Sequence, residues 1–297
     1  MAGRIAAGLM ALFILLLPLV AAASPFLEGP GEEISADAEN GQWIYRSQHL
    51  AILITRRSDD TPLVWYEAEV YASPEMPLHT YISEGTKKPG RRLVNPLRLA
   101  RDNNVVLAIS DDFCGYRLRR DLTAGIVIRE GQVLSSKTFN RNKWRTWPNL
   151  DTLAVYPDGS MKTYPCDQLT AEEYLALGAT NVFAFGPVLV SEGELNQRVL
   201  DADYYPYPEP RMAIGMIEPY HYMIVAVEGR KKTSVGAKPD WLARKMQQLG
   251  CVEALNLDGG GTAVMIFMGH VINRSEKSLR SINSLIGFGQ SGQVQGK

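Results

Sequence analysis

The chain has 297 residues, of which 45% are hydrophobic and 21% charged, and its formal net charge is -1. This balance is typical of a globular protein with enough apolar material for a sizeable core. A charge so near zero excludes any general attraction to nucleic acid or to an anionic membrane, so electrostatic binding must come from local patches.

The N-terminus has the features of a secretory signal. Arg4 precedes an apolar run from Ile5 to Val20, and the small residues 21–24 follow it. This order predicts cleavage near Ala23. An uncleaved anchor is the alternative, because the run is only slightly shorter than the about 20 residues of a membrane span. We expect a secreted, periplasmic or cell-envelope protein with no stable membrane insertion after cleavage.

The rest of the chain divides into three parts by composition. Residues 24–42 are polar, acidic and rich in glycine and proline, which predicts a linker. From Trp43 to residue 290, apolar and β-branched runs alternate with turn residues. They predict one main domain, with strands dominating its first half. The short, polar segment 291–297 predicts a flexible tail.

Two helices follow from local signals. Thr170, with Glu173 three residues later, is a capping-box pattern that predicts a helix over 170–178. Residues 239–249 carry an apolar stripe and predict a second helix, with apolar strand candidates on both sides of it. Strand, helix and strand together predict a right-handed crossover at about 221–257. The expected fold class is therefore α+β: a mixed, strand-rich twisted sheet with a few packed helices.

Three consecutive glycines follow Asp258, within the stretch from Ala254 to Arg274. We expect a buried strand that ends at Asp258 and a partner strand over 262–268. Two glycines are enough for a turn. A third is explained if backbone must approach something closely, or if amides must converge on an anion. The stretch lacks the Lys-Ser/Thr pair of a nucleotide phosphate loop and the helix of a Rossmann fingerprint.

Three motifs occur in a specific order along the second half of the chain. They are Arg211 with Gly215 four residues later, the run Glu228-Gly229-Arg230, and Asn256-x-Asp258 followed by three glycines. Together they resemble the phosphodiester glycosidase family, whose members include the enzyme that uncovers mannose 6-phosphate by removing N-acetylglucosamine from a sugar-phosphodiester. The resemblance covers roughly residues 100–288.

The resemblance implies which residues line or frame the active site. They are Arg211, Glu228, Arg230, Asn256, Asp258, Gly259, Gly260, Gly261 and Thr262. Asn273, after the glycine turn, matches a polar position of the same pattern. Asp112, in "SDDFCGY", aligns with the aspartate of a motif that many bacterial members have as Asn-Gly-Asp-Tyr. The chain departs from the pattern at Thr262, where members often have serine, and around Asp112.

The chemistry of the implied reaction suits these residue types. Cleavage of a sugar C1–O–phosphate bond develops positive charge at the anomeric carbon and releases a phosphate monoester, which is already a good leaving group. A carboxylate that stabilises this charge or activates water helps most, and Asp258, Glu228 and Asp112 are the candidates. We expect Arg211, Arg230 and the glycine amides to hold the phosphate.

No requirement for a cofactor is evident. The three cysteines, Cys114, Cys166 and Cys251, allow one disulfide at most and have no zinc-binding spacing. A divalent cation held by Asp258 and Asp112 is the metal alternative, although no contiguous loop of oxygen ligands supports it.

We therefore expect an exported glycosidase that hydrolyses the bond between a sugar anomeric carbon and phosphate, in a sugar-1-phosphodiester of a glycan or cell-envelope polymer. The expected partner is that glycan and not nucleic acid. The alternatives are a non-catalytic module that binds phosphorylated envelope glycans and a glycan transferase on the same scaffold. Two basic stretches, 87–101 and 137–147, remain. The second contains two tryptophans and fits either a sugar-phosphate contact or a solvated loop.

Overall fold

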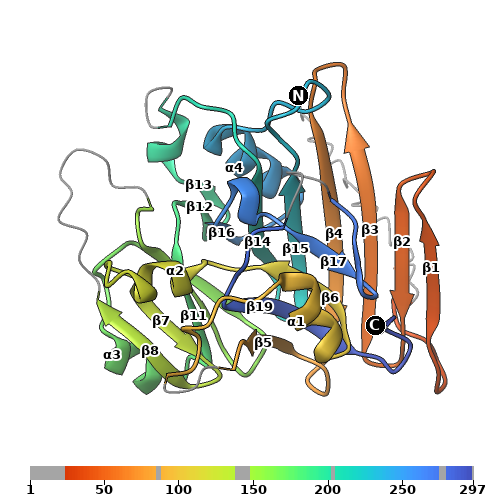
Figure 1. The fold of residues 1–297 in the computed structure, drawn as a ribbon, viewed down its shortest axis with the longest axis horizontal. Helices are drawn as coiled ribbons and strands as arrows, with labels where there is room; N and C mark the ends of the chain where they lie inside the picture. Colours follow the sequence, from red (N-terminus) through yellow and green to blue (C-terminus); the bar gives the residue numbers. More distant parts are fainter. Residues whose placement is uncertain (1–23, 85–87, 138–147, 202–204, 274–278, 296–297) are drawn as a thin grey trace, which may run out of the picture.

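Three β-sheets and four α-helices are present in the computed structural model, which describes residues 24–84, 88–137, 148–201, 205–273 and 279–295 (Figure 1). Strands dominate over helices, which confirms the expected α+β class. The predicted signal over 1–23 lies outside the described ranges. Within them, no helix combines the length and the apolar character needed to cross a bilayer.

The largest sheet has nine strands, and each adjacent pair is antiparallel. Its central strands are buried on both faces, which explains their continuous apolar sequences. In spatial order the strands are β1 (Glu33–Asp37), β2 (Gln42–Arg46), β3 (Leu50–Ser58), β4 (Val64–Ala72), β15 (His221–Val227), β14 (Arg211–Glu218), β16 (Glu253–Leu257), β12 (Val188–Ser191) and β13 (Glu194–Leu195).

Helix α4 (Pro239–Gln248) crosses from β15 to β16 over the strand that lies between them. Both β15 and β16 are antiparallel to β14, so they are parallel to each other. Leu242 and Met246 bury the apolar stripe of α4 against the sheet. The helix is followed by Gly250 in the left-handed region, with φ of 87°. The predicted strand-helix-strand unit is confirmed.

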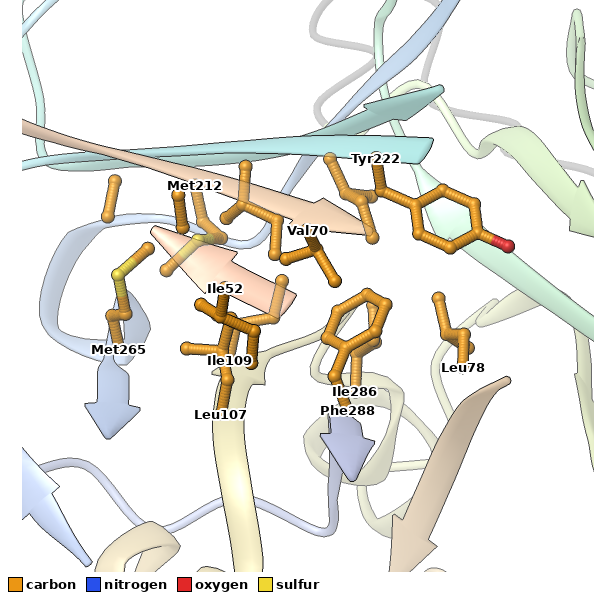
Figure 2. Close-up of a cluster of buried hydrophobic side chains, with 14 of the residues drawn as sticks. Ile52, Val70, Leu78, Leu107, Ile109, Met212, Tyr222, Met265, Ile286 and Phe288 are labelled. Carbon is orange, nitrogen blue, oxygen red and sulfur yellow. The ribbon is translucent and has the colours of Figure 1, made fainter. Parts of the chain in front are cut away.

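The second sheet has five antiparallel strands and packs face to face on the nine-stranded sheet. The main core lies between these two sheets. In Figure 2, Ile52 and Met212 of the nine-stranded sheet lie with Leu107, Ile109 and Phe288 of the second sheet in one apolar cluster. In spatial order the strands of the second sheet are β18 (His270–Val271), β17 (Met265–Phe267), β6 (Val105–Ser110), β19 (Ser284–Gln290) and β5 (Leu78–Ile82).

The third sheet also has five antiparallel strands. Helix α3 (Ala171–Ala176) packs on it and begins with the predicted capping box, in which Thr170 and Glu173 bond each other's amides at 3.2 and 2.7 Å. In spatial order its strands are β10 (Met161–Tyr164), β9 (Asp151–Val155), β11 (Asn181–Phe185), β7 (Gly125–Arg129) and β8 (Gln132–Lys137).

Two further α-helices are too short to show a helical period in the sequence. Helix α1 (Pro96–Asp102) covers the outer face of the second sheet through Leu99, and Asn95 caps its N-terminus. Helix α2 (Cys114–Arg119) follows β6 after a three-residue turn. Two 3₁₀ turns complete the described elements: η1 (Gln197–Leu200) and η2 (Gly260–Thr262).

The segment predicted as a linker, 24–42, contains the edge strand β1. Ile34 packs against the main core, and Glu32 accepts a 2.7 Å hydrogen bond from the hydroxyl of Tyr45. A few anchoring contacts are enough to order this strand once a partner strand is present. The polar composition of the segment therefore gave a wrong prediction.

The tail predicted as flexible is docked as far as residue 295. Val294 is buried in the main core. Ser291 and Gln293 donate hydrogen bonds of 2.7 and 2.9 Å to the carboxylate of Glu32. The two ends of the described chain are thus joined through one buried apolar side chain and one carboxylate.

Candidate active site

The nine-stranded sheet and the second sheet meet at Asp258. This residue follows β16, and its amide donates a 3.1 Å hydrogen bond to the carbonyl oxygen of Asp111, which follows β6. The glycines then carry the chain through η2 into β17, which pairs with β6. The expectation that residues 262–268 pair with the strand before Asp258 is therefore wrong. The glycine run links two sheets and does not close a hairpin.

The glycines permit a close approach between backbones. The amide of Gly260 donates a 2.9 Å hydrogen bond to the carbonyl oxygen of Pro210. A Cβ atom on Gly259 would lie 2.3 Å from that same oxygen. Gly260 has φ of 60°, in the left-handed region that favours glycine. The sequence expectation of close approach is met within the protein itself, and the amide of Gly260 is not a spare donor for an anion.

Pro210 joins the three motifs of the sequence. It directly precedes Arg211, and its carbonyl oxygen accepts the hydrogen bond from the amide of Gly260 in the glycine turn. A Cβ atom on Gly229 would lie 2.7 Å from the nitrogen of Pro210, so the Glu228-Gly229-Arg230 run packs against the same residue. Motifs that are separated along the chain therefore occupy one place in the fold, at the ends of β14, β15 and β16.

Asp258 is the carboxylate at the centre of this place. Its side chain is crowded by neighbours but keeps part of its surface open to solvent. Burial raises the pKa of Asp258 to about 6, although a hydrogen bond with Thr262 and the charges of Arg117 and Arg280 favour the ionised form. A carboxylate that changes charge near neutral pH is suited to acid–base work.

Arg117, on α2, is a cation that the sequence motifs do not include. Its side chain is buried, and its Nη2 atom donates to the carbonyl oxygens of Asp112 and Ala184 at 2.7 and 2.9 Å. Its Nε and Nη1 atoms are buried without a hydrogen-bond partner. The run Arg117-Leu118-Arg119-Arg120 gives no signal that separates the buried arginine from its exposed neighbours. The site therefore contains a buried positive charge that only the fold identifies.

Two more arginines border the glycine turn. The exposed Arg280 donates a 3.4 Å hydrogen bond to the hydroxyl of Thr262, which lies buried in the turn. Arg230 donates from Nε to Glu209 at 2.7 Å, and its Nη2 atom lies 3.1 Å from the position of a Cβ on Gly260. The side chain of Arg230 is 45% exposed. Arg230 was predicted from the sequence, whereas Arg280 was not.

Arg211 is largely occupied within the protein. Its Nε atom donates to the carbonyl oxygen of Ala237 at 2.9 Å, and Nη2 donates to that of Tyr207 at 3.3 Å. Its guanidinium also lies 4.8 Å from the ring centroid of Tyr205. These contacts hold the segments around residues 205–207 and 237 next to β14. The geometry favours a framing role for Arg211 over the direct phosphate contact that the sequence predicted.

Glu228 is buried in the turn after β15. Its carboxylate accepts hydrogen bonds from the hydroxyl of Tyr66 at 3.1 Å and from Nζ of Lys231 at 3.4 Å. The hydroxyl of Ser234 donates to the backbone carbonyl of Glu228 and closes the turn. These contacts fix the turn that carries Arg230. Glu228 remains a second carboxylate of the site region, held by a hydroxyl and an ammonium group.

Asp112 does not fit its predicted catalytic role. It is fully buried, and its carboxylate accepts hydrogen bonds from Arg129 at 2.7 Å and from the amides of Cys114 and Ala184 at 3.2 and 2.8 Å. Arg129 also pairs with Asp111 at 3.1 Å. Burial and the charge of Asp112 raise the pKa of Asp111. This sealed cluster of one arginine and two aspartates supports the ends of β6 and β7, and none of its charges faces solvent.

The two predicted asparagines lie on either side of the turn. Asn273 accepts from the amide of Met265 at 2.7 Å and donates to the carbonyl of Ala263 at 3.0 Å, so it fixes the exit of the glycine run. Asn256 donates to the carbonyls of Gly186 and Leu257 at 3.0 and 2.9 Å, and its Oδ1 atom is buried without a partner. Both residues therefore hold backbone segments around Asp258.

No metal centre is preassembled in the described ranges, where no three His, Cys, Asp or Glu side chains come together as ligands. A cation between Asp258 and Asp112, the metal alternative from the sequence, would have to displace the hydrogen bonds of Asp112 to Arg129 and to two amides. Cys114 and Cys251 are buried free thiols. Most of the basic stretch 137–147, with both of its tryptophans, lies outside the described residues.

Comparison with known proteins shows the family to which this chain belongs. The family model for phosphodiester glycosidase matches residues 103–289, a range that contains every predicted site residue. A prophage-derived uncharacterized protein of Bacillus subtilis, YomE, is 33% identical over 179 residues. That match covers 60% of this chain and 26% of the relative, so the chain spans about a quarter of the relative's length.

Solved structures share the fold at low sequence identity. The catalytic domain of zebrafish N-acetylglucosamine-1-phosphodiester alpha-N-acetylglucosaminidase, auto-inhibited by its pro-peptide, aligns with a TM-score of 0.62 at 15% identity, over 88% of each chain. A hypothetical protein from Synechocystis aligns with a TM-score of 0.54 at 16% identity, over 88% of this chain and 64% of the other. These likenesses establish a shared architecture.

Proposed function

Because this chain belongs to the phosphodiester glycosidase family, we propose that it hydrolyses the bond between a sugar anomeric carbon and phosphate in a sugar-1-phosphodiester. One observation carries the proposal: the partly exposed carboxylate of Asp258 lies in a turn bordered by the guanidinium groups of Arg230 and Arg280. The reaction needs an anion next to the anomeric carbon and cations next to the phosphate, and this arrangement provides both.

Asp258 is assigned the role of stabilising the positive charge that develops at the anomeric carbon, or of activating the attacking water. At neutral pH, above its pKa of about 6, this carboxylate is mostly ionised. Thr262 orients it by a hydrogen bond. The released phosphate monoester carries its own negative charge, so the reaction demands little protonation of the leaving group.

Arg230 and Arg280 are assigned to the phosphate. Each is accessible, and each contacts the glycine turn next to Asp258. A guanidinium group binds two phosphate oxygens at once through parallel N–H donors. Two such groups, one beside Gly260 and one beside Thr262, would fix both the position and the orientation of the phosphodiester. The buried Arg117 supplies further positive charge near Asp258.

We further propose that the protein is exported and that its natural substrate is a glycan or cell-envelope phosphodiester. The support is the apolar N-terminal run that ends in small residues. Detection of the mature protein outside the cytoplasm, with an N-terminus near Ser24, tests this part. A mature protein that begins at Met1 in the membrane fraction would contradict cleavage.

The activity is tested with a panel of synthetic sugar-1-phosphodiesters and mass spectrometry of the products. Hydrolysis predicts free sugar and a phosphate monoester in equal amounts. Transfer to added acceptor glycans, without free sugar, would replace the proposal with a transferase. Tight binding without turnover across the panel, unchanged in Asp258→Asn, would replace it with a binding module.

A further inference from the structure

A second group of arginine and lysine side chains lies away from the glycine turn. We call Lys88, Arg91, Arg92, Arg119 and Arg120 the basic surface. All five side chains are exposed. Over the part of the chain that the structure describes, none of the five forms an ion pair with a carboxylate. Unpaired like charges repel one another, so such a cluster favours an anionic partner.

These residues belong to one region of the fold. A Cβ atom on Gly90 would lie 3.3 Å from the side chain of Leu134 on β8, so the loop around residues 88–92 packs beside that strand. The same position is 3.4 Å from the side chain of Asn283, which accepts a 2.9 Å hydrogen bond from the amide of Gly115 on α2. The loop, β8 and α2 therefore adjoin.

A pocket of about 250 Å³ opens between these elements. It has both cationic and apolar walls. Its lining residues are Arg91, Leu118, Asp121, Leu122, Val133, Leu134, Ser135, Ser136 and Lys137. Leu122 and Val133 remain 48% and 39% exposed, which gives the pocket apolar surface suited to the carbon face of a sugar or polyol. Its carboxylate, Asp121, is already paired with Lys137 at 3.2 Å.

Helix α2 connects this pocket with the candidate active site. Arg117 places its charge near Asp258, whereas the next residue, Leu118, lines the pocket. The helix has six residues and is therefore about 9 Å long. Arg119 and Arg120 follow at its C-terminal end, where Arg120 lies 5.7 Å from the ring centroid of the half-exposed Tyr116. Adjacent residues of α2 therefore reach the candidate site and the pocket.

We infer that the basic surface and its pocket bind phosphate groups of the substrate beyond the one that is cleaved, so that the substrate is a polymer of phosphodiester-linked units. This inference rests on the proposed function. A single sugar-1-phosphodiester would engage only Asp258 and the arginines of the glycine turn. A longer chain would also cross α2 and place a further phosphate against Arg91 or Arg120.

The test measures kcat/KM of the intact purified protein for sugar-phosphodiester oligomers of one, three and six units. The variant Arg91→Gln/Arg92→Gln/Arg120→Gln removes three charges from the basic surface. The matched control, Arg46→Gln/Arg57→Gln/Arg98→Gln, removes three charges that are paired with carboxylates elsewhere. Because none of the six side chains is buried, thermal unfolding should be similar for both variants.

We expect kcat/KM for the six-unit oligomer to fall at least about tenfold in the basic-surface variant, with one-unit turnover unchanged and the control unaffected. The affinity for the six-unit oligomer should also become less dependent on salt, since each lost phosphate contact removes counterion release. Equal kcat/KM values for one and six units in the unmodified protein would overturn the inference.

Binding measured by fluorescence anisotropy separates this inference from the proposed activity. If no substrate is turned over, length-dependent binding that the basic-surface variant loses still supports the surface as a polyanion site. If single-stranded RNA of equal charge binds more tightly than the phosphodiester oligomer, the surface is a nucleic-acid site and the inference is wrong.

Discussion

The amide of Asp258 is hydrogen-bonded to the carbonyl oxygen of Asp111 at 3.1 Å, and this single bond joins the ends of strands from two different sheets. The two aspartates differ in their surroundings. Asp258 keeps an open side, whereas Asp111 is sealed with Arg129. One strand end therefore carries the carboxylate that we propose for catalysis, and the other carries a buried carboxylate that supports it.

Replacement of Asp258 by asparagine should lower kcat/KM by about 100- to 10,000-fold, the range expected for loss of a positioned acid–base group. Asparagine has the same shape, so the fold should be retained. Release of free sugar from the best sugar-1-phosphodiester measures the effect, and circular dichroism checks the fold. Asp102→Asn, at the exposed end of α1, is the matched control. Full activity of Asp258→Asn would remove this residue from the mechanism.

The same substitution should stabilise the protein at neutral pH. The pKa of Asp258 is raised from 3.8 to about 6, so the folded chain holds this proton more tightly than the unfolded chain. The contribution of Asp258 to stability is present below about pH 4 and is lost as pH rises through 6. We expect Tm of Asp258→Asn to exceed that of the unmodified protein at pH 7.5, with the difference disappearing at pH 4. A lower Tm at pH 7.5 would show that burial is not the dominant influence.

The activity of the unmodified protein should rise with pH through about 6, because the ionised form of Asp258 is the reactive one. Arg117→Gln should move this midpoint to higher pH, since the lost positive charge favours ionisation. Arg119→Gln, next to it on α2 but exposed, should leave the midpoint unchanged. Profiles of kcat/KM against pH for the three proteins provide the measurement, and identical midpoints would contradict an electrostatic role for Arg117.

Removal of Arg129 should destabilise the fold by about 3–5 kcal/mol, the cost of leaving buried charges without their partner. Arg129 is the shared partner of Asp111 and Asp112, and all three side chains are buried. Urea unfolding of Arg129→Ala checks this value. Arg98→Ala breaks only the exposed pair with Asp102 and should change the unfolding midpoint little. Similar midpoints for both variants would contradict a supporting role for the sealed cluster.

The two glycines next to Asp258 should respond differently to alanine. At Gly259 the new Cβ would meet the Pro210 carbonyl oxygen at 2.3 Å, which the backbone cannot avoid, so little folded protein is expected. At Gly260 the Cβ would lie 3.1 Å from Nη2 of Arg230, a side chain that can move. We expect Gly260→Ala to fold with a Tm lowered by strain at its positive φ, and with weaker substrate binding. Yields, Tm and KM of the two variants decide between these outcomes.

Local signals were sufficient for part of the fold. The capping box at Thr170 and the apolar stripe before Gly250 are both complete within about one helix length, so α3 and α4 could be predicted. The sheet arrangement could not be predicted in the same way. β17 pairs with β6, far earlier in the chain, and only packing of the whole core decides that pairing over the nearer β16.

The residues of the candidate site also fall into two groups: those that local sequence identifies and those that only the tertiary fold brings together. Asp258 and Arg230 belong to motifs that can be read from a few adjacent residues, and the structure brings both to the glycine turn. Arg117 and Arg280 approach Asp258 only through the tertiary fold, so no sequence pattern marked them. Asp112 was selected by alignment, but the strand end directs its carboxylate toward Arg129. Residue type alone does not say whether an aspartate at a strand end faces a site or is sealed in the interior.

The position of β19 has a consequence for the order of folding. This strand, residues 284–290, lies between β6 and β5, and it supplies Ile286 and Phe288 to the main core. During synthesis the earlier strands emerge first, and their sheet has a gap until residue 290 has left the ribosome. The main core therefore cannot close while most of the chain is already exposed. Such a late-arriving central strand would suit the export proposed above, because an exported chain must stay unfolded until it has crossed the membrane.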